Sequence, residues 1–297
     1  MKTNIEVERG RMEMANVSFI KTPEEVQYFL DFGKNGVNFD HQEGLYVAWL
    51  TKPEIVQKLV PPPLEPIAPI VVTYTSYFYE TNFWKDYNEG ALFIPVQYKG
   101  KKFSYCLAMP IAGRNDIPIF FGREGLGYPK KNVDELAVVR RGDQVKVWIE
   151  RHGIRYFEVE AEIGDYNDPL AENLFGSYKD GAEVLSSAVN FKYNIDLVKN
   201  KTKISNVQLV ESLNKTKFYT AEKARVKKIT LQPSIDDPWA ELEVVKPLGA
   251  SYCKYSISMY DSEVLADLDA EKYAPYLFAR WDASMVGHEY RNFIIRK

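Results

Sequence analysis

The chain has 297 residues, 45% of them hydrophobic and 27% charged, which is typical of a folded globular protein with a sizeable core. Its net charge of −3 argues against a nucleic-acid partner, whose phosphates usually require a basic protein face. Two cysteines and three scattered histidines argue against a disulfide framework and a metal site. The first residues lack the apolar segment of a signal peptide, and no run of about 18 apolar residues occurs, so we expect a cytoplasmic protein without a membrane span.

Four short helices are predicted, at residues 22–33, in the two turns after Pro53, at 168–175 and at 269–284. Thr22 and Glu25 form a capping-box pattern at the start of the first helix. Pro53 suits the first turn of the second helix, and the prolines at 61–63 must end it. The helices are therefore short and far apart in the sequence.

Strands are predicted for most of the remaining chain, from 70–79 to 252–260, because these stretches are rich in β-branched and aromatic residues. The turns at 99–101 and 151–153 each separate two such stretches, as in β-hairpins. Many antiparallel strands with few peripheral helices indicate an α+β fold. We expect the sheet to curl into a closed or cone-like barrel, which removes exposed edges and encloses an interior.

The stretch FGREGLGYPKK (121–131) places a lysine pair directly after a glycine-rich, aromatic and proline-containing run. Glycine permits a close approach of the backbone, and Pro129 fixes the chain immediately before Lys130. Both burial and the like charge of Lys131 would lower the pKa of Lys130 from its ordinary value of about 10.4. A lysine amine that is neutral near pH 7 can attack a carbonyl group.

GRE…GYPKK (122–131) resembles the signature of the acetoacetate decarboxylase superfamily. LVPPPLEP (59–66) and YNEGALFIPVQYKG (87–100) resemble two further segments of that family, in the same order and with similar spacing. The resemblance implies one acetoacetate decarboxylase-like domain over residues 1–297, with an N-terminal extension at 1–35 and a C-terminal helical addition at 261–297. It also implies a homo-oligomer, a small keto acid as substrate, and no metal or organic cofactor.

The same resemblance implies roles for three catalytic residues. Lys130 matches the family's Schiff-base lysine, whose pKa is lowered for nucleophilic attack, and Lys131 matches the neighbour that lowers this pKa. Glu89 matches the active-site glutamate, which could position substrate or relay a proton. Lys130 would form an iminium with a β-keto acid and accept the electrons of the carbon–carboxylate bond as carbon dioxide leaves.

Other residues would shape the pocket or the loop. Arg123 and Glu124 match a structural Gly-Arg-Glu turn, and we expect a buried-end salt bridge there. Tyr128 and Tyr252 could each bind substrate or pack in the core. Gln42 occupies the position, by gapless counting, where the family's decarboxylases hold the substrate carboxylate with an arginine.

Gln42 stands where the family's decarboxylases have an arginine, and an amide offers neither charge nor a bidentate fork. The type of reaction is therefore left open. Decarboxylation of acetoacetate or a related β-keto acid is the leading prediction. An aldolase or dehydratase acting on pyruvate-like keto acids through the same lysine is the first alternative. A barrel that binds a ligand without turnover is the second.

Overall fold

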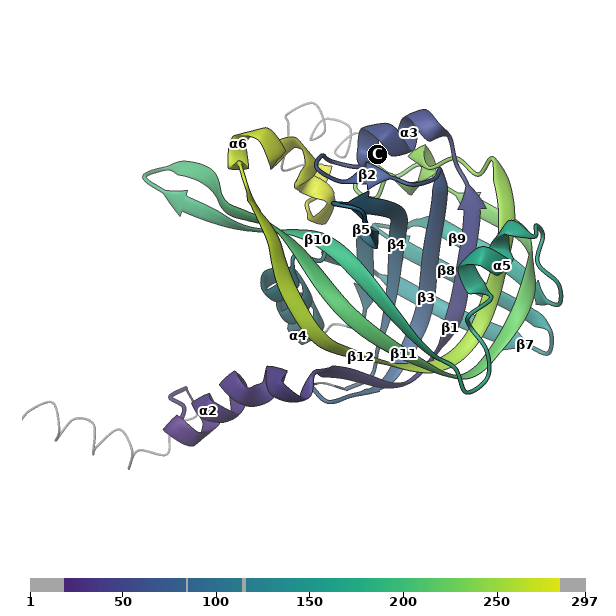
Figure 1. Cartoon of the computed structure of the whole chain (residues 1–297), viewed down its shortest axis with the longest axis horizontal. Helices are drawn as coiled ribbons and strands as arrows, with labels where there is room; N and C mark the ends of the chain where they lie inside the picture. The colour runs from purple at the N-terminus through teal and green to yellow at the C-terminus, as the bar shows by residue number, and fades with distance from the viewer. Residues whose placement is uncertain (1–18, 84, 114–115, 284–297) are drawn as a thin grey trace, which may run out of the picture.

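One large, mostly antiparallel sheet curls round until its strands form a ring (Figure 1). The computed structural model describes residues 19–83, 85–113 and 116–283. The strands are β1 (Val37–Leu50), β2 (Glu65–Pro66), β3 (Ile70–Thr81), β4 (Tyr87–Tyr98), β5 (Lys101–Ala112), β6 (Lys130–Asn132), β7 (Glu135–Arg141), β8 (Gln144–Arg151), β9 (Ile154–Ile163), β10 (Glu183–Val198), β11 (Lys201–Leu231) and β12 (Lys246–Leu268). The helices are α2 (Pro23–Asp31), α3 (Pro53–Leu59), α4 (Asp116–Ile119), α5 (Leu170–Phe175) and α6 (Ala270–Tyr273), with the π-helix η2 (Phe120–Gly125) and 3-10 turns η1 (Phe32–Asn35), η3 (Trp239–Glu241), η4 (Ala274–Tyr276) and η5 (Phe278–Arg280).

The ring follows the strand order β10-β5-β4-β3-β1-β12-β11 and closes where β10 pairs with β11. A short parallel contact joins β10 to β5, between Ala188 and Ser104 and between Val189 and Tyr105. Strands β9, β8 and β7 continue outward from β11 as a branch of the same sheet. The α+β class and the closed, cone-like barrel are therefore confirmed.

Strand β1 is buried on both faces. Leu45, Val47 and Trp49 belong to a core shared with β7–β9, whereas Tyr46 and Ala48 face a second core inside the ring. A strand with two buried faces reads as a continuous apolar run rather than an alternating one. For this reason the strand at 37–50 is missing from the predicted elements.

Several local predictions are confirmed. The capping box of α2 forms between Thr22 and Glu25. The two predicted hairpin turns contain a residue of positive φ followed by glycine: Lys99 (49°) with Gly100 (78°), and His152 (52°) with Gly153 (71°). Two successive positive φ values match the twist of a tight antiparallel hairpin.

The C-terminal helical addition expected over 261–297 begins later than predicted, because β12 continues to Leu268 and pairs with β11 along that length. The helix expected over 269–284 is broken into α6, η4 and η5. Pro275 cannot donate a backbone hydrogen bond, so a continuous helix is not possible there. Residues 1–18 of the expected N-terminal extension and 284–297 of the C-terminal addition lie outside the described residues.

No helix in the described part of the chain is both long enough and apolar enough to cross a membrane.

The loop before β6 requires glycine at position 127. Gly127 has φ +80°, and a Cβ atom there would lie 2.6 Å from the backbone nitrogen of Lys192 in β10. We expect Gly127→Ala to lower the free energy of unfolding by about 2 kcal/mol or more, because the backbone becomes strained and the added methyl group clashes. Gly125→Ala is the matched control, since nothing lies within 4 Å of its Cβ position. Equal stability of the two variants in urea denaturation would contradict this prediction.

Candidate active site

The ring encloses a cavity of about 760 Å³. Phenylalanine is the commonest residue of its mainly apolar wall, and several tyrosines join it; this aromatic part includes Phe39, Tyr46, Tyr74, Phe78, Phe93, Tyr178 and Phe218. Phe29, Leu30 and Phe32, from α2 and η1, also line it, and Phe29 and Leu30 are exposed. The cavity therefore runs from an apolar outer rim into the interior of the ring.

Lys130 lies in the wall of this cavity, on the short strand β6 beside β5. It is 5% exposed. Gly122 of η2 packs against it so closely that a Cβ atom there would lie 2.2 Å from Lys130 Cε. The sequence predicted a close approach at this glycine-rich turn, and the structure identifies the Lys130 side chain as the group approached.

Glu89 of β4 is the partner of Lys130. Lys130 Nζ donates to Glu89 Oε2 at 2.8 Å, and Glu89 is 4% exposed. The other carboxylate oxygen, Oε1, accepts a hydrogen bond of 2.5 Å from the Tyr74 hydroxyl of β3. Glu89 is thus not the exposed turn residue that its position beside Gly90 could suggest.

A group of buried phenols surrounds this pair. Burial, together with the Glu89 carboxylate, raises the pKa of Tyr74 and Tyr87 well above the usual value. Burial likewise raises the pKa of Tyr46 and Tyr255. These tyrosines are therefore neutral hydrogen-bonding groups at physiological pH.

Lys131 points away from Lys130, since adjacent residues of a strand face opposite sides. Its amine contacts the backbone oxygen of Asp236 at 2.5 Å and the carboxylates of Asp237 at 3.2 Å and Asp282 at 3.5 Å. Lys131 is buried too, and the prediction that its charge lies beside the Lys130 amine is wrong, because the two amines bind different partners. Its contacts fasten β6 to the segments that follow β11 and η5.

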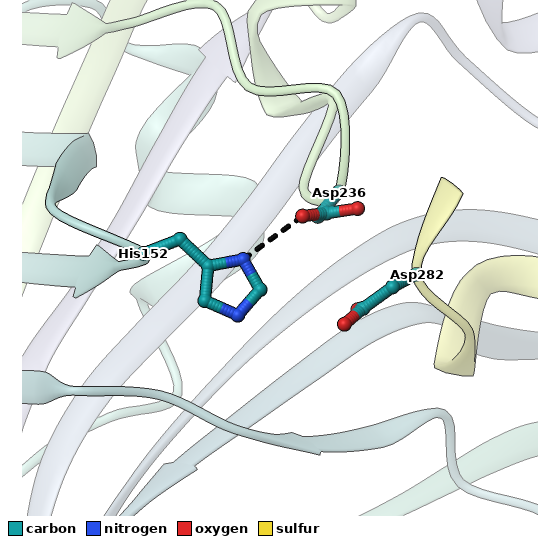
Figure 2. Close-up of side chains that lie close together, drawn as sticks. All are labelled: His152, Asp236 and Asp282. Atoms are coloured by element: carbon teal, nitrogen blue, oxygen red, sulfur yellow. Dashed lines mark hydrogen bonds and ion pairs between the residues drawn. The ribbon is translucent and has the colours of Figure 1, made fainter. Parts of the chain in front are cut away.

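His152, Asp236 and Asp282 lie close enough together to share a metal ion, with one ligand atom each within 4.8 Å of the others (Figure 2). Their ligand atoms already have protein partners. His152 Nδ1 bonds Asp236 at 2.9 Å, and Arg151 bonds both oxygens of Asp282 at 2.8 and 2.9 Å. Arg151 and Lys131 both contact the Asp282 carboxylate, so the group is already part of an ion-pair network.

Two predicted substrate-binding residues lie outside the cavity wall. Gln42 is buried beside a bulge of β1 and donates to the backbone oxygen of Phe39 at 2.9 Å. Tyr252 belongs to the core outside the ring, and its hydroxyl donates to Glu43. Strand alternation explains Tyr252, which pairs with Leu45 on the outer face. Gln42 pairs with Phe78 and Tyr255 of the inner core, but its side chain turns back to the bulge and does not line the cavity.

The third predicted residue, Tyr128, does line the cavity. Burial raises its pKa to about 12, while Ser212 and Asn190 act in the opposite direction. The Arg123–Glu124 pair is different from the prediction: Arg123 Nε contacts Glu124 Oε1 at 2.9 Å, but the two side chains are 36% and 42% exposed. It is a surface contact between neighbouring residues of η2 and not a buried salt bridge.

Sequence reasoning missed Tyr74. The register of β3 and β4 pairs Ser76 with Glu89, so Tyr74 is the diagonal neighbour of Glu89 on the same face. Only this register brings the phenol and the carboxylate together. The alternation of TYTSYF could have indicated that Tyr74 and Phe78 share a face, but not that the face is the cavity wall.

The chain belongs to the acetoacetate decarboxylase (ADC) family, whose sequence model matches residues 21–268. It is 31% identical over 284 residues to the CLA biosynthesis isomerase of Lactiplantibacillus plantarum, covering 94% of this chain and 99% of that protein. It is 34% identical over 139 residues to the acetoacetate decarboxylase of Burkholderia cenocepacia (strain HI2424), covering 45% of this chain and 56% of that enzyme.

Solved structures of this fold agree with the ring described above. The acetoacetate decarboxylase of Legionella pneumophila superposes with a TM-score of 0.67 at 20% identity, over 78% of this chain and 88% of that chain. The enduracididine biosynthesis enzyme MppR, solved with the condensation product of pyruvate and imidazole 4-carboxaldehyde, gives a TM-score of 0.58 at 14% identity, over 79% and 90%. At these identities the two likenesses establish the fold alone.

We expect Lys131→Met to lower the free energy of unfolding by roughly 2–3 kcal/mol, because Asp237 and Asp282 lose one of their buried cationic partners. Lys102→Met, at an exposed position, is the matched control and should change stability by less than about 0.5 kcal/mol. Urea denaturation measures both. A neutral effect of Lys131→Met would mean that its contacts do not fasten β6.

Proposed function

We propose that this protein is an isomerase that shifts a carbon–carbon double bond into conjugation with a carbonyl group. Its substrate would carry a bulky apolar substituent. Lys130 would activate the carbonyl and Glu89 would carry the proton. The observation that carries this proposal is the Lys130–Glu89 pair, 2.8 Å apart, in the wall of a large, mainly apolar cavity with many aromatic side chains. The 31% identity to an isomerase over nearly the whole chain supports the same reaction type.

The chemistry follows from the two side chains. Neutral Lys130 adds to the carbonyl carbon, and the adduct loses water to give an iminium. A proton on the saturated carbon between the iminium and the carbon–carbon double bond passes to Glu89, and the electrons of its C–H bond flow into the iminium to leave a dienamine. Glu89 returns the proton to a different carbon, and water then releases the isomerised carbonyl compound and the free amine.

The lining of the cavity favours an apolar substituent over a small keto acid. Among the described residues, Lys130 is the only lysine or arginine in the wall, so a substrate carboxylate would have no second cation to bind. Acetoacetate would also leave most of the 760 Å³ unfilled. A larger apolar group would bury more surface against the aromatic wall.

Decarboxylation of a β-keto acid with a long apolar chain is the second candidate. The identity to an acetoacetate decarboxylase over 139 residues favours it, and the iminium on Lys130 serves this reaction equally well. Aldol or dehydration chemistry on pyruvate-like acids has no comparable support, because the likeness to MppR concerns the fold only.

Borohydride trapping tests the shared first step. We expect reduction in the presence of a medium-chain methyl ketone to label Lys130, identified by peptide mass spectrometry, and acetoacetate to label it less. Lys130→Met should abolish the label. The double variant Lys130→Met/Glu89→Gln removes the buried pair together and controls for an orphaned carboxylate. Labelling confined to other lysines would exclude the iminium mechanism.

Product analysis separates the two candidate reactions. A β,γ-unsaturated ketone with an apolar chain should become conjugated, seen as a rise in enone absorbance, and Glu89→Gln should slow this by about 100-fold or more. Lys102→Met is the control and should leave the rate unchanged, because Lys102 is exposed and lies outside the cavity wall. Release of carbon dioxide from the corresponding 3-oxo acid, with no effect on the unsaturated ketone, would instead support the decarboxylase.

A further inference from the structure

Both oxygens of the Glu89 carboxylate are occupied. Oε2 accepts from Lys130 at 2.8 Å, and Oε1 accepts from the Tyr74 hydroxyl at 2.5 Å. All three side chains are buried, and all three line the cavity. Tyr74 therefore lies in the cavity wall, in direct contact with the Lys130–Glu89 pair.

This arrangement matters because Lys130 must be neutral before it can attack a carbonyl. At that stage Glu89 is a buried carboxylate whose cationic partner has gone. A buried charge without a partner is strongly unfavourable, whereas hydrogen bonds to the charged form stabilise it. The hydrogen bond from Tyr74 does not depend on the charge of Lys130 and persists through this step.

Other titratable groups face Glu89 from each neighbouring element: Tyr87 on β4, Cys106 on β5, Tyr128 before β6 and Tyr255 on β12. Burial raises the pKa of each, so all four are neutral near pH 7. The Tyr87 hydroxyl interacts with Glu89 but, among the described residues, has no hydrogen-bond partner of normal geometry. Tyr74 is thus distinguished by its short and direct contact.

Packing holds the Tyr74 ring in place. Its centroid lies 5.6 Å from that of Tyr46, 6.1 Å from Phe93 and 6.4 Å from Phe78. Tyr74 also sits on β3, directly beside the strand that carries Glu89. A donor fixed by a strand and three aromatic neighbours keeps its direction without the loss of entropy that a mobile donor would suffer.

We propose that Tyr74 is a positioning residue: its hydroxyl holds the Glu89 carboxylate oriented toward Lys130 while the amine is neutral. The role that this gives to Glu89 rests on the proposed function. The hydrogen bond itself can be tested without any activity.

The direct test follows Glu89 by carbon-13 NMR of protein labelled at the glutamate carboxyl carbon, with the Glu89 signal assigned by its loss in Glu89→Gln. In Tyr74→Phe we expect this signal to move at neutral pH, because the carboxylate loses one of its two hydrogen bonds. Tyr79→Phe is the matched control: Tyr79 lies on the same strand and donates to Glu43 at 3.3 Å, but its side chain is exposed and lies outside the cavity wall. A Glu89 signal that stays in place in folded Tyr74→Phe would overturn the proposal.

A second readout uses pentane-2,4-dione, which forms an absorbing enaminone with a reactive primary amine. We expect Tyr74→Phe to form the enaminone at Lys130 about tenfold more slowly at saturating diketone, with little change in the half-saturating concentration, and Tyr79→Phe to match the unaltered protein. Equal rates in Tyr74→Phe and the unaltered protein would count against the proposal. If the unaltered protein forms no enaminone, the proposed function fails, whereas the NMR comparison still decides the role of Tyr74.

Discussion

A buried ion pair in an apolar cavity is the constraint on which this protein depends. Lys130 and Glu89 are both almost fully removed from solvent, and neither charge would be stable there alone. The pair is stable only because β4 and β6 present the two side chains at hydrogen-bonding distance. Every element that holds β4 and β6 in place therefore helps to keep Lys130 and Glu89 at this distance.

Two of the hydrophobic cores lie on either face of β1. The inner core contributes aromatic side chains to the cavity wall around the pair. The outer core, between β1 and the β7–β9 branch, packs against the other face of the sheet. Lys131 belongs to a third arrangement, an ionic cluster with Asp237, Asp282 and Arg151 that holds β6 from outside the cavity. Two neighbouring lysines thus have different physical environments because a strand sends them to opposite faces.

The residues that line the cavity bear on the type of reaction, which family membership alone does not determine. Membership of the acetoacetate decarboxylase family accounts for the ring of strands. It does not determine what Lys130 does, because a lysine-bound iminium can assist either the breaking of a carbon–carboxylate bond or the movement of a proton. In both reactions the iminium receives the bond electrons, so the groups that move the proton and hold the rest of the substrate decide the outcome. Here those neighbours are a carboxylate, several neutral phenols and a mainly apolar wall.

The sequence by itself determined the fold class and the hairpin turns, and it singled out Lys130 and Glu89, because these depend on local patterns and short motifs. It could not determine that Lys131 faces away, that Gln42 and Tyr252 lie outside the cavity wall, or that Tyr74 bonds to Glu89. Those facts depend on strand register, bulges and the closure of the ring, which bring together residues such as Tyr74 and Glu89 from different strands. The tertiary structure alone decided them, since a one-residue shift in register would exchange the inner and outer faces of a strand.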